Sequence, residues 1–193
     1  MVDLVFEISG VTLPASYPFA LWDEISRLIP QLGESESAGI IPLRLAEGEE
    51  GMLLNKRTKL ALRLPGDLCE VAAGLANKKL RVAGNDLSLG TCKTRPIQPY
   101  PTLHAHLVTG AEDEAAFMAE MKAGLAAMNV RANLICGKRN QLSDGERTIR
   151  GYSLVLHDLA ANDSLQVQYA GLGRDRRFGC GIFVPYKVIS GLE

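Results

Sequence analysis

The stretch LHAHLV at residues 103–108, followed by EDEAAFMAEMKAGLAAM at residues 112–128, marks the point where one order of secondary-structure elements begins for the second time. In the first segment apolar residues alternate with two histidines, which predicts a strand with one buried face. In the second, apolar residues three and four positions apart form one helical stripe behind three N-terminal acids. A strand followed by such a helix opens a β-α-β-β-α-β unit.

The rest of the second half completes that unit. Alternating apolar residues predict strands at 130–136 and 148–157, joined by a polar turn at 137–145. Asn162 or Asp163 is expected to cap a short helix, and residues 182–189 are expected to form the last strand.

The first half has the same order of elements. Periodicity predicts a strand at 2–8, a helix at 18–29 that ends at Pro30, and strands at 40–45 and 60–64. A short helix at 68–75 and a strand at 80–89, interrupted by a turn at 84–86, follow.

Two consecutive β-α-β-β-α-β units predict an α+β protein made of two tandem ferredoxin-like units. We expect an N-terminal unit at residues 1–90, a Pro-rich linker at 91–101 and a C-terminal unit at 102–193. Helices would cover one face of each sheet, so the free faces are expected to face a central cleft.

Composition excludes several classes of protein. With 47% hydrophobic and 22% charged residues, the balance is that of a globular domain. No apolar run reaches the roughly 20 residues that span a bilayer, the start lacks a basic region, and the four cysteines lack metal-ligand spacing. We therefore expect a cytoplasmic protein with reduced cysteines, no metal site and no membrane partner.

The net charge of −1 hides an uneven distribution. Residues 1–54 contain two basic and nine acidic residues, a net charge of −7, whereas residues 55–193 contain 19 basic and 13 acidic residues, a net charge of +6. This asymmetry is compatible with a nucleic-acid partner, and equally with solvated faces of unequal sign.

A glycine-rich segment, GLGRDRRFGCG at residues 171–181, carries most of the functional information. It is no dinucleotide fingerprint, because Arg176 stands where the third glycine would fall, and no Gly-Lys-Ser/Thr follows as in a Walker A loop. Glycines let a phosphate approach the backbone, and arginines bind it with two donors, so we predict a loop that binds a polyanion backbone. The alternative is a tight turn with a solvated basic tip. The predicted contacts are Gly171, Gly173, Arg174, Arg176, Arg177, Gly179 and Gly181.

This segment, continued by IFVPYK at residues 182–187, resembles the C-terminal motif of the CRISPR-associated repeat-RNA endoribonucleases of the RAMP superfamily. The compact MYXAN-type branch of the Cas-six family is the most similar. The likeness covers nearly the whole chain, with supporting matches at 12–14, 38–40, 60–65 and 164–166.

The resemblance implies two ferredoxin-like units and cleavage of CRISPR repeat RNA beside a stem-loop, without metal or cofactor. The 2′-hydroxyl would attack the neighbouring phosphate and leave a 2′,3′-cyclic phosphate, with the product kept bound. The expected partner is the crRNA stem-loop, and other effector subunits are a further possibility.

That chemistry needs a base, an acid and a cation. Family members have a histidine near the first helix, and in the most similar branch histidines are expected about where Tyr17 and Ile41 stand here. Tyr17 could orient or donate a proton, and Arg44 could stabilise the cleaved phosphate. His104 and His106 share one strand face, roughly 7 Å apart. They are predicted either as an acid/base pair or phosphate contacts, or as polar residues on a half-exposed face.

Further cations complete the set of candidate RNA contacts: Lys138, Arg139 and Lys187.

Three functions compete. The first is a metal-independent endoribonuclease that matures CRISPR RNA. The second is a catalytically inactive RNA-binding subunit that holds the guide RNA in an effector complex. The third, an enzyme acting on a small phosphate compound, is disfavoured because no nucleotide-binding motif is complete.

Overall fold

The computed structural model describes residues 1–10, 12–43, 46–48, 51–55 and 57–186. The chain forms two compact units. The first consists of Met1–Ile97 with two later segments, Leu142–Thr148 and Arg176–Gly179. The second consists of Gln98–Gln141, Ile149–Asp175 and Cys180–Glu193.

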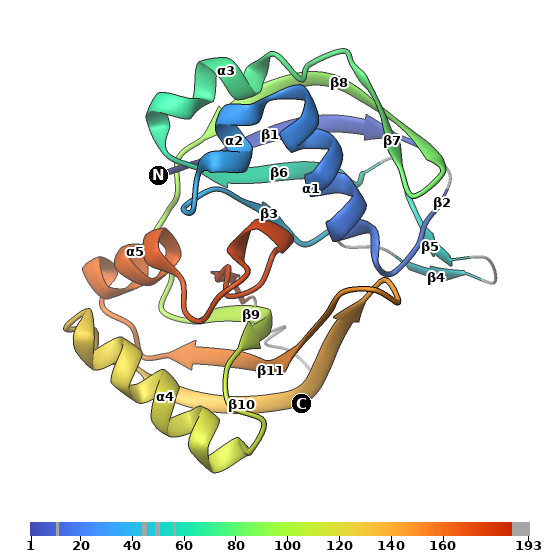
Figure 1. Cartoon of the computed structure of the whole chain (residues 1–193). Coiled ribbons are helices and arrows are strands. Elements are labelled where there is room, and N and C mark those ends of the chain that lie inside the picture. The colour runs from blue at the N-terminus through green and yellow to red at the C-terminus, as the bar shows by residue number, and fades with distance from the viewer. Residues whose placement is uncertain (11, 44–45, 49–50, 56, 187–193) are drawn as a thin grey trace, which may run out of the picture. The chain divides into compact units, whose positions relative to one another are not determined.

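The first unit is built on a five-stranded sheet in the order β3-β6-β1-β8-β7, in which neighbouring strands are antiparallel. Its helices lie on one face of this sheet (Figure 1). The strands are β1 (Val2–Ser9), β3 (Gly39–Ile41), β6 (Lys59–Leu64), β7 (Lys79–Val82) and β8 (Asn85–Arg95). The helices are α1 (Tyr17–Leu28), α2 (Pro30–Glu34) and α3 (Cys69–Ala73), the last preceded by a 3-10 turn, η1 (Gly66–Leu68).

Period-2 and helical patterns account for the core of the first unit. Leu4 and Phe6 of β1 point to the helices, where Leu21 and Ile25 of α1 lie on one stripe and are buried with them. Pro30 ends α1 as predicted and also begins α2, since the first helical turn needs no N–H donor there. A small sheet of β2 (Thr12–Leu13), β5 (Gly51–Leu53) and β4 (Ala46–Gly48) completes the unit.

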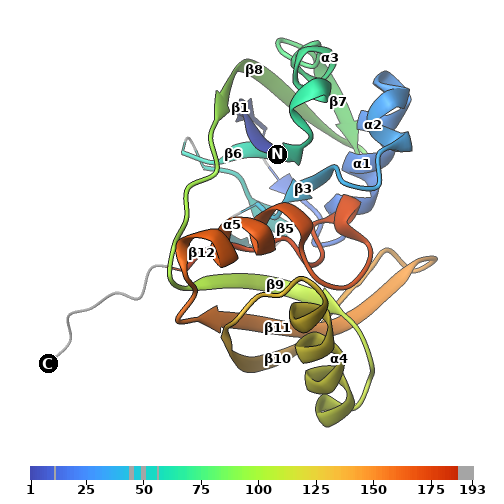
Figure 2. The same ribbon diagram turned by 90° about the vertical axis from the view of Figure 1, so that its left-hand side faces the viewer.

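The second unit is built on a four-stranded sheet in the order β10-β11-β9-β12. Its strands are β9 (Leu103–Thr109), β10 (Asn133–Ser143), β11 (Thr148–His157) and β12 (Val184–Pro185). Both helices, α4 (Glu114–Ala127) and α5 (Ala161–Ala170), pack on the same face of β9 and β11 (Figure 2). Phe117 of α4 and Val167 of α5 are fully buried in one core with Leu154 of β11.

Several details differ from the sequence-based expectation. In the predicted strand at 40–45, the described residues are strand only to Ile41, and neither α2 nor the small three-stranded sheet was predicted. β8 continues to Arg95, where an irregular linker was predicted from residue 91, and β10 continues to Ser143 through the predicted polar turn. The described part of the last strand is only Val184–Pro185. Helix α5 begins after Ala160, so Asn162 and Asp163 lie inside its first turn instead of capping it. β10 lies at the edge of its sheet, where polar residues hide the alternation of apolar residues that predicts a strand. This explains why its second half was predicted as a turn.

The four cysteines are free thiols, and the expectation that most of them are buried is wrong. Only Cys180 is buried, and burial raises the pKa of its thiol to about 12; the other three are partly buried. Among the described residues, no helix is both long enough and apolar enough to cross a membrane.

Candidate functional site

The glycine-rich segment divides between the two units. Gly171–Asp175 and Cys180–Gly181 belong to the second unit, and Arg176–Gly179 belongs to the first. All four of its predicted glycines have positive φ angles, between 65° and 89°. Such a conformation costs an L residue about 1–2 kcal/mol, so the glycine pattern is first a requirement of the backbone.

In the second unit, the segment is bonded closely to β9. The Gly181 amide donates to the Leu107 carbonyl over 2.8 Å, and the Gly181 carbonyl accepts from the Leu172 amide over 3.3 Å. The Thr109 hydroxyl accepts a hydrogen bond from the Arg174 amide. A side chain at 173 would meet the Thr109 carbonyl at 2.5 Å.

These bonds change how the segment could bind a polyanion. Several of its amides already donate within the protein, namely those of Gly171, Leu172, Arg174, Gly179 and Gly181. The predicted approach of a phosphate to these amides would have to displace existing hydrogen bonds. The side chains of Arg174 and Arg177 are exposed, so they are better placed for an external anion.

In the first unit, residues 176–178 form a 3-10 turn, η2 (Arg176–Phe178). Arg176 donates from Nε to the Ser37 carbonyl over 2.8 Å. The Phe178 ring meets the Phe19 ring edge-on, with centroids 4.8 Å apart. The Arg177 guanidinium carbon lies 5.9 Å from the Phe178 ring centroid. The turn therefore holds one arginine inward and presents the next one outward.

The two histidines on β9 lie as the alternation predicted. His104 is half-buried and His106 is exposed, while Leu103 and Ala105 are buried in the core. The His104 ring packs against the Tyr186 ring, with centroids 5.5 Å apart. Burial, and then the charge of His106, lower the pKa of His104, which favours its neutral form.

Tyr17 lies in a different setting from that expected of a proton donor. It is buried at the start of α1, and its hydroxyl accepts a hydrogen bond from the Leu43 amide over 2.7 Å. Burial raises the pKa of Tyr17 to about 12, against a smaller lowering by the Leu43 amide. This hydroxyl already has a partner that fixes the chain after β3.

Lys138 and Arg139 are exposed on β10. Arg139 lies 3.5 Å from the Glu112 carboxylate, and both side chains are largely exposed, so this ion pair is weak and can open. With Asn140, Gln141 and Arg150, Arg139 lines an open hollow of about 420 Å³. Arg150 thereby adds a second guanidinium beside Arg139. The predicted candidates Arg44 and Lys187 lie outside the described residues.

Comparison with known proteins assigns the family. The family model described as Cas6 Crispr matches residues 2–188. A Myxococcus xanthus (strain DK1622) protein named CRISPR-associated endonuclease Cas6 is 36% identical over 186 residues, which cover 95% of this chain and 81% of that protein. The chain belongs to the Cas6 family. The predicted resemblance is confirmed.

Solved structures confirm the fold class. A Cas6-related protein from Pyrococcus furiosus has a TM-score of 0.66 at 11% identity, covering 99% of both chains. A RAMP protein described as binding different RNA substrates has a TM-score of 0.68 at 11% identity, covering 95% of this chain and 98% of that one. The endoribonuclease Cse3, bound to a 19-nucleotide RNA, has a TM-score of 0.55 at 10% identity, covering 95% and 98%. The α+β class with two tandem ferredoxin-like units is thus confirmed.

Sequence reasoning missed two ion pairs of this Cas6-family chain; it considered Arg147 only as a possible RNA contact. Arg147 donates to both carboxylate oxygens of Asp23, over 3.2 and 2.9 Å, and its guanidinium lies 4.4 Å above the Phe19 ring. Asp3 and Arg63 form a buried ion pair on β1 and β6. For the Asp3–Arg63 pair the sequence offers one signal, opposite charges on the non-core faces of two strands. This signal can be recognised only when the register of the two strands is known.

Proposed function

We propose that this Cas6-family protein is an endoribonuclease that cuts CRISPR repeat RNA. The observation that carries the proposal is the 36% identity, over 95% of the chain, to a protein named as a CRISPR-associated endonuclease. The RNA bound to Cse3, which shares the fold, supports RNA as the substrate class.

The proposed reaction is a transesterification that needs no metal. The 2′-hydroxyl oxygen attacks the adjacent phosphorus, the P–O5′ bond breaks, and the products are a 2′,3′-cyclic phosphate and a 5′-hydroxyl. One group accepts the 2′-hydroxyl proton, and another donates a proton to O5′. A cation stabilises the charge that gathers on the phosphoryl oxygens.

His104 and His106 are the proposed proton carriers. The lowered pKa of His104 keeps it neutral near pH 7, which suits the base. His106 is exposed two residues along the same strand, roughly 7 Å away, where it can donate to the leaving oxygen. Tyr17 stays a weaker candidate because its buried hydroxyl already accepts a hydrogen bond from the Leu43 amide.

RNA backbone contacts are assigned to exposed cations. Arg174 precedes η2, Arg177 lies within it, and Lys138 and Arg139 lie on β10. The glycines of residues 171–181 shape this segment. Arg44, as the phosphate-stabilising cation, and Lys187, as a backbone contact, stay predictions.

The test is cleavage of the stem-loop repeat RNA from the protein's own locus, in EDTA, beside a copy with 2′-deoxyribose at the cut. We expect cleavage of the first RNA alone, with a cyclic phosphate end. His104→Asn and His106→Asn should each slow cleavage with nearly unchanged binding. His157→Asn is the matched control, because His157 is a histidine on β11 paired with Asp158 over 2.8 Å. Equal cleavage by all three variants would remove the pair from the mechanism.

A second function has one observation in its favour. The chain has no histidine before His104, and Tyr17 and Ile41 stand where the resemblance implies catalytic histidines. A Cas6-family RNA-binding subunit that holds the guide RNA without cutting it is therefore the alternative. Tight binding of the repeat RNA without any product would select it.

A further inference from the structure

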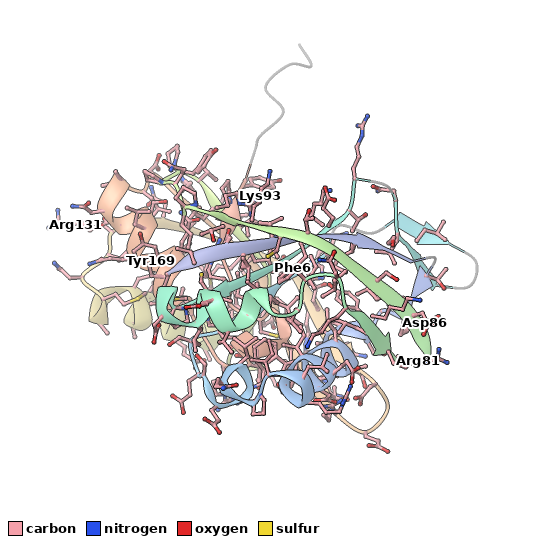
Figure 3. The ribbon with its side chains drawn as sticks, turned by 90° about the horizontal axis from the view of Figure 1, so that it is seen from above. Phe6, Arg81, Asp86, Lys93, Arg131 and Tyr169 are labelled. Atoms are coloured by element: carbon pink, nitrogen blue, oxygen red, sulfur yellow. The ribbon has the colours of Figure 1, made fainter. Side chains whose placement is uncertain are left out.

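A buried cluster of charges lies on the face of the first sheet opposite its helices. Arg63 donates to Asp3 from Nε over 2.8 Å and from Nη2 over 3.2 Å, and Arg95 donates to the same carboxylate over 3.1 Å. Asp3 is 3% exposed and Arg63 only 1%. Lys93, which is labelled in Figure 3, lies two residues before Arg95 on β8 and therefore on the same face of the sheet. Charged side chains are almost never buried so completely unless they are paired with one another.

Arg176 of the glycine-rich segment interacts electrostatically with this cluster. Burial, and then the positive charge of Arg63, lower the pKa of Arg176 to about 10, while Asp3 acts in the opposite direction. Arg176 therefore stays protonated at neutral pH. Its Nε donates to the Ser37 carbonyl over 2.8 Å, which directs the guanidinium toward the chain that leads into β3.

The rest of η2 is held in the same place. Phe178 packs edge-on against Phe19, and the Gly179 amide donates to the Arg176 carbonyl over 2.9 Å. A Cβ at Gly179 would meet Pro42 at 2.9 Å and the Ile40 carbonyl at 3.0 Å. Within this turn the exposed cation is Arg177.

We propose that Arg176 is a positioning residue that fixes η2 and so holds Arg177 in place to bind an RNA phosphate. The proposal rests on the proposed RNA-binding function and replaces direct RNA contact as the role of Arg176. Arginine is needed because its planar guanidinium donates from Nε to the Ser37 carbonyl while its charge interacts electrostatically with Asp3 and Arg63. Lysine would keep the charge without this geometry.

Arg174 supplies the matched control. It is another exposed arginine of the same segment, but it belongs to the second unit, where Thr109 accepts from its amide and donates to its carbonyl over 3.1 Å. Loss of the Arg176 bonds should leave Arg174 in place. The loss of RNA affinity caused by replacing Arg176 should therefore overlap with the loss caused by replacing Arg177 and be independent of the loss caused by replacing Arg174.

The experiment measures repeat-RNA affinity against salt concentration for the full chain. Each phosphate contact contributes about 0.7–0.9 to the slope of log K against log salt concentration. Relative to 1 M salt, one such contact therefore raises the affinity about fivefold at 0.15 M salt. We expect Arg177→Ala, Arg176→Lys and Arg176→Met each to lower the slope by one contact. In a double variant, Arg176→Lys should cause no further loss of slope beyond that of Arg177→Ala. Combined with Arg174→Ala, it should add its full loss of slope.

The charge-conserving variant decides between the two roles of Arg176. If Arg176 bound phosphate itself, Arg176→Lys would keep the wild-type slope and only Arg176→Met would lose a contact. Wild-type slopes for both variants, or full additivity with Arg177→Ala, would also overturn the proposal.

Hydrogen exchange in the free protein keeps the test independent of RNA. The Gly179 amide should exchange at least tenfold faster in both Arg176 variants and at the wild-type rate in Arg177→Ala. If the wild-type chain bound no RNA, the proposed function would fail, whereas the exchange data would still report on the turn. Unchanged Gly179 exchange would refute the positioning role directly.

Discussion

Gly181→Ala, in the second unit, should lower the free energy of unfolding far more than Gly84→Ala in the first unit. Both glycines have positive φ, 65° at Gly181 and 81° at Gly84. A Cβ at Gly84 meets nothing within 4 Å, whereas a Cβ at Gly181 overlaps the Leu172 carbonyl oxygen. The pair therefore separates the cost of a backbone conformation from the cost of a collision.

The magnitudes follow from these two settings. A positive φ costs alanine about 1–2 kcal/mol, and the stiffer unfolded chain returns about 0.4–1 kcal/mol, so Gly84→Ala should cost about 1 kcal/mol. At Gly181 the overlap with backbone adds about 1–3 kcal/mol, as overpacking does in cores, which gives about 2–4 kcal/mol in all. Moving Leu172 also strains its 3.3 Å hydrogen bond to Gly181.

Urea unfolding followed by circular dichroism measures the free energies, and hydrogen exchange of the Leu172 and Gly181 amides locates the opening. We expect faster exchange at both amides in Gly181→Ala and wild-type rates in Gly84→Ala. Equal destabilisation by the two variants would show that the collision is relieved without cost. The glycine pattern would then need a functional explanation.

Three further outcomes test individual side chains. Because burial in the folded chain lowers the pKa of His104, the stability that the neutral imidazole contributes should be fully present above about pH 6.5 and should decline as the pH falls through the lowered pKa. His104→Asn should abolish this part of the pH dependence of the free energy of unfolding. Tyr17→Phe should cost about 1–3 kcal/mol by leaving the Leu43 amide without its acceptor, with cleavage rates retained; lost cleavage at retained stability would instead make Tyr17 catalytic. Asp3→Asn should cost about 3–5 kcal/mol in urea unfolding, because it removes the charge that pairs with the buried Arg63. Asp3→Leu with Arg63→Met should recover much of this loss, and a double variant as unstable as Asp3→Asn would contradict the reasoning.

Local periodicity predicted the elements whose apolar residues define one face. Strands β1, β6 and β9 and helices α1 and α4 lie where the pattern placed them, within a residue or two. Their burial is set by the same alternation that the sequence shows. This part of the fold needs no knowledge of the partner elements.

Elements that depend on pairing were harder to predict. β8 extends to Arg95 because Asp3 on the neighbouring strand pairs with it, and that register is invisible in a single sequence. The second half of β10, from Gly137 on, carries Lys138 and Arg139 in an edge strand with little apolar alternation, so the sequence predicted a turn there. Cross-strand partners, not local propensity, decide both cases.

The candidate site shows the same division. The exposure of His106 and the half-burial of His104 follow from alternation on β9, and the structure agrees. The three arginines of residues 174–177 looked equivalent in sequence, yet Arg176 alone donates to a backbone carbonyl more than a hundred residues away. Only the folded chain could separate it from Arg174 and Arg177.

The glycine-rich segment therefore has to be considered apart from catalysis. Its glycines satisfy positive φ angles and close approaches to Thr109 and Leu172, which any member of this fold with the same chain path would need. Those constraints hold whether or not RNA is cut, so the motif supports the fold and an RNA-binding role equally in an enzyme and in an inactive subunit. Proton transfer needs titratable groups with matched pKa values, and a glycine loop supplies none. Under the proposed mechanism, the choice between nuclease and RNA-holding subunit thus depends on His104, whose pKa burial lowers, as the proposed base, and on the exposed His106 as the proposed acid.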